Sequence, residues 1–266
     1  MTELFATHSD ISLDLIEDLA REAGEIALNF FRRDPQVWTK GDDSPVSEAD
    51  LAVDAFLKKT LLANHPGFGW VSEESASAPD RIADGPIFVV DPIDGTRAFV
   101  QGTTNWSISI GVIENSRPIA GVLYCPALDE LYRARRGEGA ELNGEAITVS
   151  AAKSPHGAQT SGPRGLLNDK EFFDLSLDLQ PHIASLAYRL AQVADGRQGF
   201  TLAKGNSHDW DLVAADLLVH EAGGRLTGID GKELQYNEGI LAHPALICAP
   251  AAFHADLCHR VAAVLS

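Results

Sequence analysis

Residues 87–96 read IFVVDPIDGT, an apolar run that ends in a tight acidic turn. The apolar residues predict a buried strand, and the turn places Asp91 and Asp94 at its carboxyl end. Polar residues at the carboxyl end of a core strand are typical of α/β active sites. Because Pro92 fixes φ and Gly95 permits close approach of a ligand, we expect both carboxylates to project from a stiff corner. Hard oxygen ligands on such a corner suit Mg²⁺.

The spacing of Asp91 and Asp94 distinguishes this turn from the D-x-D-G-T signature of phosphatases that use an aspartyl nucleophile. In that signature the two carboxylates lie two residues apart on an extended segment and share a face. Here they lie three residues apart, with a proline and a turn between them. This geometry favours sharing a metal ion over acting as nucleophile and acid. The alternative is a plain Asx-turn, in which an aspartate caps the backbone after a strand.

Length, composition and charge indicate a soluble globular protein. The 266 residues lie at the upper end of one domain or the lower end of two. No apolar run reaches membrane-spanning length and the N-terminus lacks a signal-peptide pattern, so we expect an unexported protein with no membrane partner. A net charge of −17 disfavours nucleic acid as a partner. The unpaired spacing of Cys125, Cys248 and Cys258 favours free thiols in a reducing cytoplasm.

The first half of the chain has the pattern of helices packed on a largely antiparallel sheet. Helical spacing covers residues 11–31, and the capping-box pattern of Ser47 to Asp50 opens a second helix to about Ala63. Residues 97–100 are expected to begin a short helix whose first N–H groups face the acidic turn. Loops are expected at residues 41–45 and 77–85, and strands at residues 37–40, 68–71, 87–90, 107–113, 119–124 and 130–133.

The second half alternates helix and strand in the manner of α/β proteins. A shift toward Ala, Ser, Pro and Gly near residues 150–165 suggests a boundary between an N-terminal half, residues 1–150, and a C-terminal half, residues 151–266. Helices are expected at residues 185–194, 210–222 and 251–265, and strands at residues 200–203, 225–228 and 246–249. The fold class is therefore α+β to α/β.

Three further acidic positions are candidate site residues, and each also has a purely structural explanation. Asp50 would, as a helix cap, accept a hydrogen bond from a backbone N–H. Glu73 follows a strand end beside a second glutamate, which is ordinary for surface charge. Asp209 and Asp211 open a helix, where an N-cap aspartate is common. A functional Asp211 needs to face the corner that carries Asp91.

Two separated motifs carry a resemblance to a known family. Glu73-Glu74-Ser75, residues 91–96, and Trp210-Asp211 followed by residues 221–224 resemble the signature of the inositol monophosphatase family, in the same order along the chain. The likeness extends from the loop at Lys40 to the C-terminal helix. It implies a layered αβαβα sandwich, of the type found in sugar phosphatases, that hydrolyses phosphate monoesters with Mg²⁺.

The resemblance also implies a set of metal ligands. Glu73, Asp91 and the Ile93 carbonyl would hold one Mg²⁺, while Asp91, Asp94 and Asp211 would hold a second. A weaker third ion would bind Glu73 through water. The physical chemistry agrees, because a phosphate monoester repels nucleophiles until cations neutralise its oxygens. Acidic side chains clustered without a cation would repel one another and raise their own pKa values.

The catalytic and substrate contacts follow from the same resemblance. Gly95 and Thr96 would offer N–H groups to the phosphate, and Thr96, with Asp50 behind it and Glu73 beside it, would orient the attacking water. Lys204 stands where inositol enzymes usually have a glutamate, and a cation there suits a second phosphate or carboxylate. A surface lysine is the plain alternative. The implied substrate contacts are Ile93, Asp94, Gly95, Thr96, Lys204 and Asp211.

The substrate and the molecular role stay open at this point. The family includes inositol monophosphatases, 3′(2′),5′-bisphosphate nucleotidases and histidinol phosphatases, and its members suggest a homodimer that acts on a small phosphorylated metabolite. The leading hypothesis is a Mg²⁺-dependent phosphomonoesterase. A regulatory protein that keeps the fold and binds a protein partner is the alternative from another class. A calcium-binding module lacks a D-x-D-x-D-G loop and ranks lowest.

Overall fold

The structure is a computed structural model, and it describes residues 11–39, 45–75, 85–239 and 241–265. The stretch that begins at Ile87 forms the fully buried strand β4 (Ile87–Asp94) of a seven-stranded sheet. Strand β4 pairs parallel with β3 and antiparallel with β5, and the remaining pairs are antiparallel. The sheet order is β3 (Gly69–Ser72), β4, β5 (Ser107–Glu114), β6 (Arg117–Cys125), β7 (Glu130–Arg135), β8 (Gly139–Leu142) and β9 (Glu145–Ala146).

Helices cover both faces of this sheet. The first face packs against α1 (Leu13–Phe30) and α2 (Glu48–Asn64), and the second against α5 (Leu186–Ala194) and α6 (Asp209–Glu221). Alternation along β4 explains this arrangement, because Phe88 and Val90 enter the core under α1 and α2 while Ile87 and Val89 enter the core under α5 and α6.

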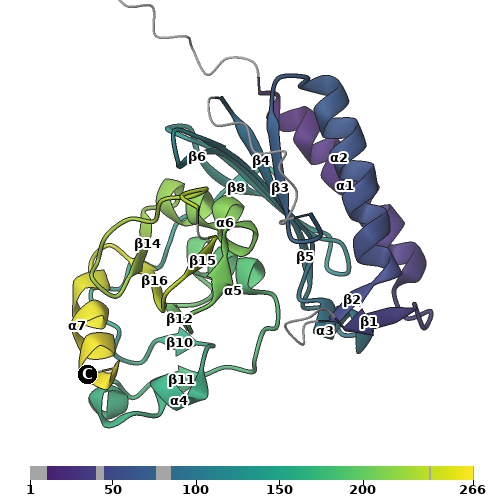
Figure 1. The fold of residues 1–266 in the computed structure, drawn as a ribbon. Coiled ribbons are helices and arrows are strands. Elements are labelled where there is room, and N and C mark those ends of the chain that lie inside the picture. The colour runs from purple at the N-terminus through teal and green to yellow at the C-terminus, as the bar shows by residue number, and fades with distance from the viewer. Residues whose placement is uncertain (1–10, 40–44, 76–84, 240, 266) are drawn as a thin grey trace, which may run out of the picture.

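A second sheet and an outer helix complete the layers (Figure 1). This antiparallel sheet has the order β12 (Thr201–Ala203), β16 (Leu246–Pro250), β14 (Gly224–Gly228), and its outer face packs against α7 (His254–Leu265). The result is the αβαβα sandwich that the resemblance implies, which confirms the predicted fold class. The proposed division at residue 150 stays a prediction. One hydrophobic core cluster contains residues from both halves, so the two halves pack against each other.

The remaining elements are short. They are the helices α3 (Thr96–Val100) and α4 (Arg164–Leu167), the 3₁₀ helix η1 (Lys170–Leu175), and three strand pairs: β1 (Val37–Thr39) with β2 (Pro45–Ser47), β10 (Gln159–Thr160) with β11 (Asp178–Leu179), and β13 (Ser207–His208) with β15 (Ala242–His243). None of the described helices combines the length and apolar character needed to cross a membrane. The three cysteines are free thiols.

Most predicted helices and strands occur where the sequence places them, with most ends shifted by no more than three residues; the strand predicted at residues 87–90 continues to Asp94. Of the loops predicted at residues 41–45 and 77–85, only Pro45, which begins β2, and Gly85 lie within the described residues. The N-cap reading of Asp209 is wrong, because His208 is the N-cap residue and the helix already begins at Asp209. Asp209 is buried instead, and it accepts hydrogen bonds from His243 Nε2 and the Asn237 amide, both at 2.7 Å.

Helix α6 lies unusually close to the central sheet because two facing strand residues are glycines. A Cβ atom at Gly111 of β5 would lie 2.3 Å from Val213 Cγ1, and one at Gly121 of β6 would lie 2.9 Å from Ala214 Cα. Both distances are shorter than real Cβ contacts allow. The backbone of α6 therefore rests almost directly on β5 and β6.

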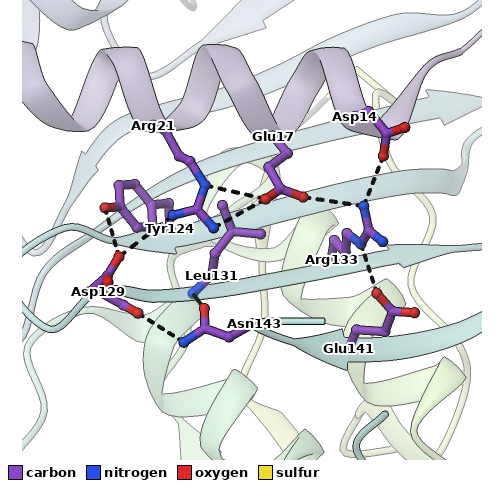
Figure 2. A network of polar contacts seen from close by, with 9 residues as sticks. All are labelled: Asp14, Glu17, Arg21, Tyr124, Asp129, Leu131, Arg133, Glu141 and Asn143. Atoms are coloured by element: carbon purple, nitrogen blue, oxygen red, sulfur yellow. Dashed lines mark hydrogen bonds and ion pairs between the residues drawn. The ribbon is translucent and has the colours of Figure 1, made fainter. Parts of the chain in front are cut away.

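Figure 2 shows polar contacts that join α1 to strands β7 and β8 of the central sheet. Arg133 of β7 pairs with Asp14 and Glu17 of α1 and with Glu141 of β8, at distances of 2.8 to 3.2 Å. Arg21 adds a second pair with Glu17 at 3.1 Å. Exposed pairs of this kind contribute little individually, so they align α1 on a core that apolar packing already holds.

Candidate active site

The acidic corner lies at the end of β4, where the pairing with β5 shifts register between Asp91 and Asp94, and it is held by its own hydrogen bonds. The Ile93 amide donates to Asp91 Oδ1 at 3.0 Å, which is the Asx-turn arrangement. Gly95 has a φ of +92°, and a Cβ atom there would lie 3.0 Å from the Ser185 amide nitrogen. The turn therefore requires glycine for its backbone conformation and for space. Asp91 can form the Asx-turn and still bind a ligand, because the turn uses only one lone pair of its carboxylate.

Asp211 reaches this corner from the start of α6. It is the third residue of the helix, and its Oδ2 accepts a hydrogen bond from the His208 amide at 2.7 Å. Oxygen atoms of Asp91, Asp94 and Asp211 all lie within 4.8 Å of one another. Asp211 thus caps its helix and faces the corner at once, as a functional role requires.

Asp94 also anchors a helix. Its carboxylate accepts hydrogen bonds from Ser185 Oγ and the Ala187 amide, both at 2.6 Å, and from the Leu186 amide at 3.2 Å. These donors are at the N-terminus of α5, where backbone N–H groups lack partners within the helix. The acidic corner and the N-terminus of α5 are therefore held together by one side chain.

Asp50 and Thr96 form a second polar pair at the cavity. Thr96 Oγ1 lies 3.2 Å from Asp50 Oδ1 and 3.1 Å from the Ile93 carbonyl oxygen, and its single proton can be donated to either acceptor. Asp50 Oδ2 accepts from the Ser47 amide at 2.9 Å, which completes the predicted capping box of α2. The cap reading of Asp50 is confirmed, and the same carboxylate reaches the cavity through Thr96.

Burial makes these carboxylates unusually hard to ionise. It raises the pKa of Asp91 and of Asp211 well above the usual range, and repulsion from Glu73 and Asp94 adds to the effect. The pKa of Asp94 rises to about 6 because burial outweighs its hydrogen bonds. Burial likewise raises the pKa of Asp50 to about 6. A divalent cation would reverse this penalty, and the oxygen donors present match the preference of Mg²⁺.

A cavity of about 290 Å³ brings the predicted residues together. It is lined by Glu73, Asp91, Asp94, Gly95, Thr96 and Asp211, together with Pro45, Arg97, His182 and Ala184. Asp50 lies behind Thr96, and the Ile93 side chain is buried while its carbonyl accepts from Thr96. Glu73 lines the cavity outside the tight group of three aspartates.

Two basic residues, Lys204, which the resemblance implies as a substrate contact, and Arg189 on α5, do not line this cavity. Lys204 is exposed and is not among the residues that line the cavity. Arg189 is only 6% exposed, and its guanidinium donates to the Leu202 carbonyl at 3.3 Å. Sequence reasoning missed the segment that runs from His182 to Ser185. Ser185 could have been predicted as an N-cap residue, because serine before a helix commonly caps it. The neighbouring sequence does not indicate that Ser185 contacts Asp94.

A layered sandwich with a carboxylate-lined cavity at the end of a core strand is the architecture of a phosphatase. The chain belongs to the inositol monophosphatase family, whose sequence model matches residues 12–265. It is 34% identical over 241 residues to a histidinol-phosphatase of Chlorobaculum parvum, covering 84% of this chain and 90% of that relative. It is 31% identical over 234 residues to inositol monophosphatase 2 of Solanum lycopersicum, covering 83% and 88%. The Thermotoga maritima IMPase structure superposes with a TM-score of 0.82 and 28% identity, covering 95% of this chain and 97% of that chain.

Proposed function

We propose that this protein hydrolyses a small phosphate monoester in a Mg²⁺-dependent reaction. The observation that carries the proposal is the meeting of Asp91, Asp94 and Asp211, from β4 and α6, with oxygen atoms within 4.8 Å. Three carboxylates at this separation, two of them buried and that of Asp211 half-buried, repel one another strongly unless cations or protons compensate them. A fold that keeps them together is best explained by a bound cation.

The residues divide into two ligand sets under this proposal. Glu73, Asp91 and the Ile93 carbonyl would hold one ion, Asp91, Asp94 and Asp211 a second, and Glu73 a weaker third ion through water. Bound Mg²⁺ supplies the positive charge that a phosphate dianion needs before a nucleophile can approach it. Asp94 can serve as a ligand and as an anchor of α5, because a carboxylate offers about four lone-pair sites.

Thr96 and Asp50 would position the attacking water. When Thr96 Oγ1 donates its hydrogen bond to Asp50 Oδ1, the lone pairs of the hydroxyl oxygen are left to accept a hydrogen bond from a water molecule. As that water attacks, its proton would pass to Thr96 Oγ1 while the hydroxyl proton of Thr96 moves to Asp50 Oδ1, so the carboxylate of Asp50 ends protonated and Thr96 stays neutral. The Gly95 and Thr96 amides donate to no other described residue, and they would bind the phosphate oxygens.

Phosphate release from a small monoester tests this proposal. Asp91→Asn should abolish turnover at saturating Mg²⁺, since it removes the charge shared by both ligand sets. Chelation should inactivate the wild-type enzyme, and added Mg²⁺ should restore it. Asp230→Asn, a substitution in an exposed loop, is the matched control and should leave turnover unchanged. Full activity in Asp91→Asn, or in excess chelator, would refute the proposal.

The geometry of the site supports phosphatase chemistry but does not select one substrate, and we propose three candidates. The relatives bear the names histidinol-phosphatase and inositol monophosphatase, so histidinol phosphate and inositol 1-phosphate are the first two. A 3′(2′),5′-bisphosphate nucleotide is the third, and Lys204 is its proposed partner. Lys204→Glu should weaken turnover of the bisphosphate selectively. An unchanged ranking of the three substrates would contradict this role of Lys204.

We also keep a cytoplasmic homodimer as a proposal supported by the family resemblance. Sedimentation equilibrium of the purified full chain would measure its mass directly. A monomer across the micromolar range would contradict the dimer.

A further inference from the structure

A second cavity, of about 550 Å³, adjoins the carboxylate cavity, and His182 lines both. Carboxamide side chains dominate its lining, so we name it the amide cavity. Besides His182 it is lined by Asn105, Gln159, Ile183, Gln192 and Gln198, among others. Its volume falls within the range of ordinary ligand pockets. His182 therefore stands at the passage between a site for phosphate and a larger polar space.

Several polar side chains of the amide cavity are available to a ligand. The side chains of Asn105, Gln159 and His182 make no hydrogen bond to another residue in the described part of the chain. Gln192 and Gln198 bond to each other at 2.9 Å, and Gln198 Oε1 accepts from the Ser161 amide at 2.7 Å. The cavity thus combines a fixed wall with donors and acceptors that lack internal partners.

The amide cavity carries almost no net charge. Its lining contains no carboxylate, and its one guanidinium, Arg197, is paired with Asp195 at 2.6 Å and with Glu130 at 2.8 Å. Burial and the nearby Arg189 lower the pKa of His182, which keeps the imidazole neutral near pH 7. Lys204 is absent from the lining of both cavities. This surface is therefore poorly suited to a second phosphate or carboxylate group.

We propose that the amide cavity binds the alcohol part of the ester and that His182 is a specificity-determining residue that contacts it. This inference rests on the proposed phosphatase function and names the class of substrate. The part of the alcohol that enters the amide cavity carries several hydrogen-bonding groups and no anionic group, so a second phosphate bound by Lys204 would lie outside this cavity. A hydroxyl or ring nitrogen near the ester bond contacts His182, and more distant polar atoms contact Asn105 and Gln159.

The test compares one minimal ester with three extended esters. Ethyl phosphate reaches only the carboxylate cavity, whereas inositol 1-phosphate, histidinol phosphate and adenosine 2′-phosphate extend beyond it. For the wild-type enzyme with Mg²⁺, kcat/KM for at least one extended ester should exceed that for ethyl phosphate tenfold or more. His182→Ala should lower that value about tenfold, mainly through KM, which is the size expected for a lost hydrogen bond.

Ethyl phosphate serves as the internal control for the chemistry. His182→Ala should lower its turnover much less than that of the extended ester, because the mutation mainly removes a contact to the alcohol. Gln159→Ala, at an exposed position, should lower kcat/KM for the same extended ester and spare ethyl phosphate. His259→Ala, at an exposed position on α7, should change neither ester.

Three results would overturn the inference. They are equal losses for ethyl phosphate and the extended ester in His182→Ala, no loss for either ester, or no extended ester preferred over ethyl phosphate by the wild-type enzyme. Failure of the wild-type enzyme to turn over ethyl phosphate or any extended ester would instead contradict the proposed function, and the inference with it. Turnover of ethyl phosphate therefore separates the two failures.

Discussion

Thr96 Oγ1 lies 3.2 Å from Asp50 Oδ1, within hydrogen-bond distance, although the two residues lie 46 positions apart in the sequence. The same Asp50 caps the first turn of α2 through the Ser47 amide. One carboxylate thus caps the first turn of α2 and contacts a residue that lines the cavity. Mutation of Thr96 separates the two roles of Asp50, in helix capping and in the reaction, because Thr96 takes no part in the cap.

Replacing Thr96 by valine tests the role of its hydroxyl group with little change in shape. Thr96→Val should lower kcat by roughly 10² to 10⁴, the range typical of groups that handle a proton. Thr96→Ser keeps the hydroxyl and should retain most of the activity. Steady-state phosphate release by the two variants checks this. Similar rates for Thr96→Val and wild type would show that the hydroxyl does not orient the nucleophile.

The buried carboxylates predict an unusual dependence of stability on pH for the Mg²⁺-free protein. The folded-state pKa values of Asp50 and Asp94, about 6, lie above the ordinary 3.8, so the folded state binds more protons than the unfolded state between these values. The free energy of unfolding should therefore fall as the pH rises from about 4 to about 6. Denaturant unfolding at several pH values measures this, and stability that rises with pH in chelator would contradict it.

Loss of a buried charge should stabilise the protein while inactivating it. In chelator at pH 7, Asp91→Asn should raise the free energy of unfolding by about 1 to 3 kcal/mol, because a carboxylate that is costly to ionise becomes a neutral amide. In Mg²⁺ the wild-type protein should regain its stability and the variant should not. Thermal melts with and without Mg²⁺ check this prediction. Equal destabilisation of the variant in both conditions would mean that Asp91 serves the turn alone.

Ser185 should affect binding of Mg²⁺ at the proposed metal site although it is not one of the proposed ligands. Its hydroxyl donates to Asp94 Oδ2 at 2.6 Å and accepts from the Tyr188 amide at 3.0 Å. Ser185→Ala should therefore cost about 1 to 3 kcal/mol of stability and raise the Mg²⁺ concentration needed for half-maximal activity. Titrating Mg²⁺ against the rate of phosphate release measures the second effect. An unaltered Mg²⁺ requirement would limit Ser185 to capping α5.

The close contact of α6 with the sheet gives a prediction that a double mutant can test. Gly111→Ala should destabilise the protein by about 1 to 3 kcal/mol, since the new methyl group overlaps Val213. Val213→Ala should recover part of that loss when the two changes are combined, a coupling that denaturant unfolding can measure. Gly67→Ala, where a Cβ atom meets no other atom within 4 Å, is the matched control. Additive effects of the two changes would contradict direct contact.

Local patterns in the sequence predicted the elements that obey a period. The helical spacing of α1 reflects burial of one face, and the continuous apolar run of β4 reflects burial of both faces of that strand. The corner at Asp91 was also predictable, because proline and glycine restrict the turn locally. Short strands such as β2, which begins at Pro45, carry too few residues to show a period.

Contacts between distant parts of the chain were beyond prediction from residues alone. Nothing near Ser185 indicates that it bonds to Asp94, and nothing near His182 places it at the cavity. The position of Asp211 followed only from the family resemblance, since a capping aspartate and a metal ligand look identical in sequence. The structure shows that Asp211 has the geometry for both, so the choice between the two readings was never exclusive.

The glycine at position 121 has a consequence for how the site is assembled. Since the main chain of α6 lies against the main chain of β6 there, the helix that carries Asp211 packs directly on the sheet that carries Asp91 and Asp94. A larger residue at position 121 would push this helix away from the sheet. Glycine thus contributes to the assembly of the site from a position outside its lining.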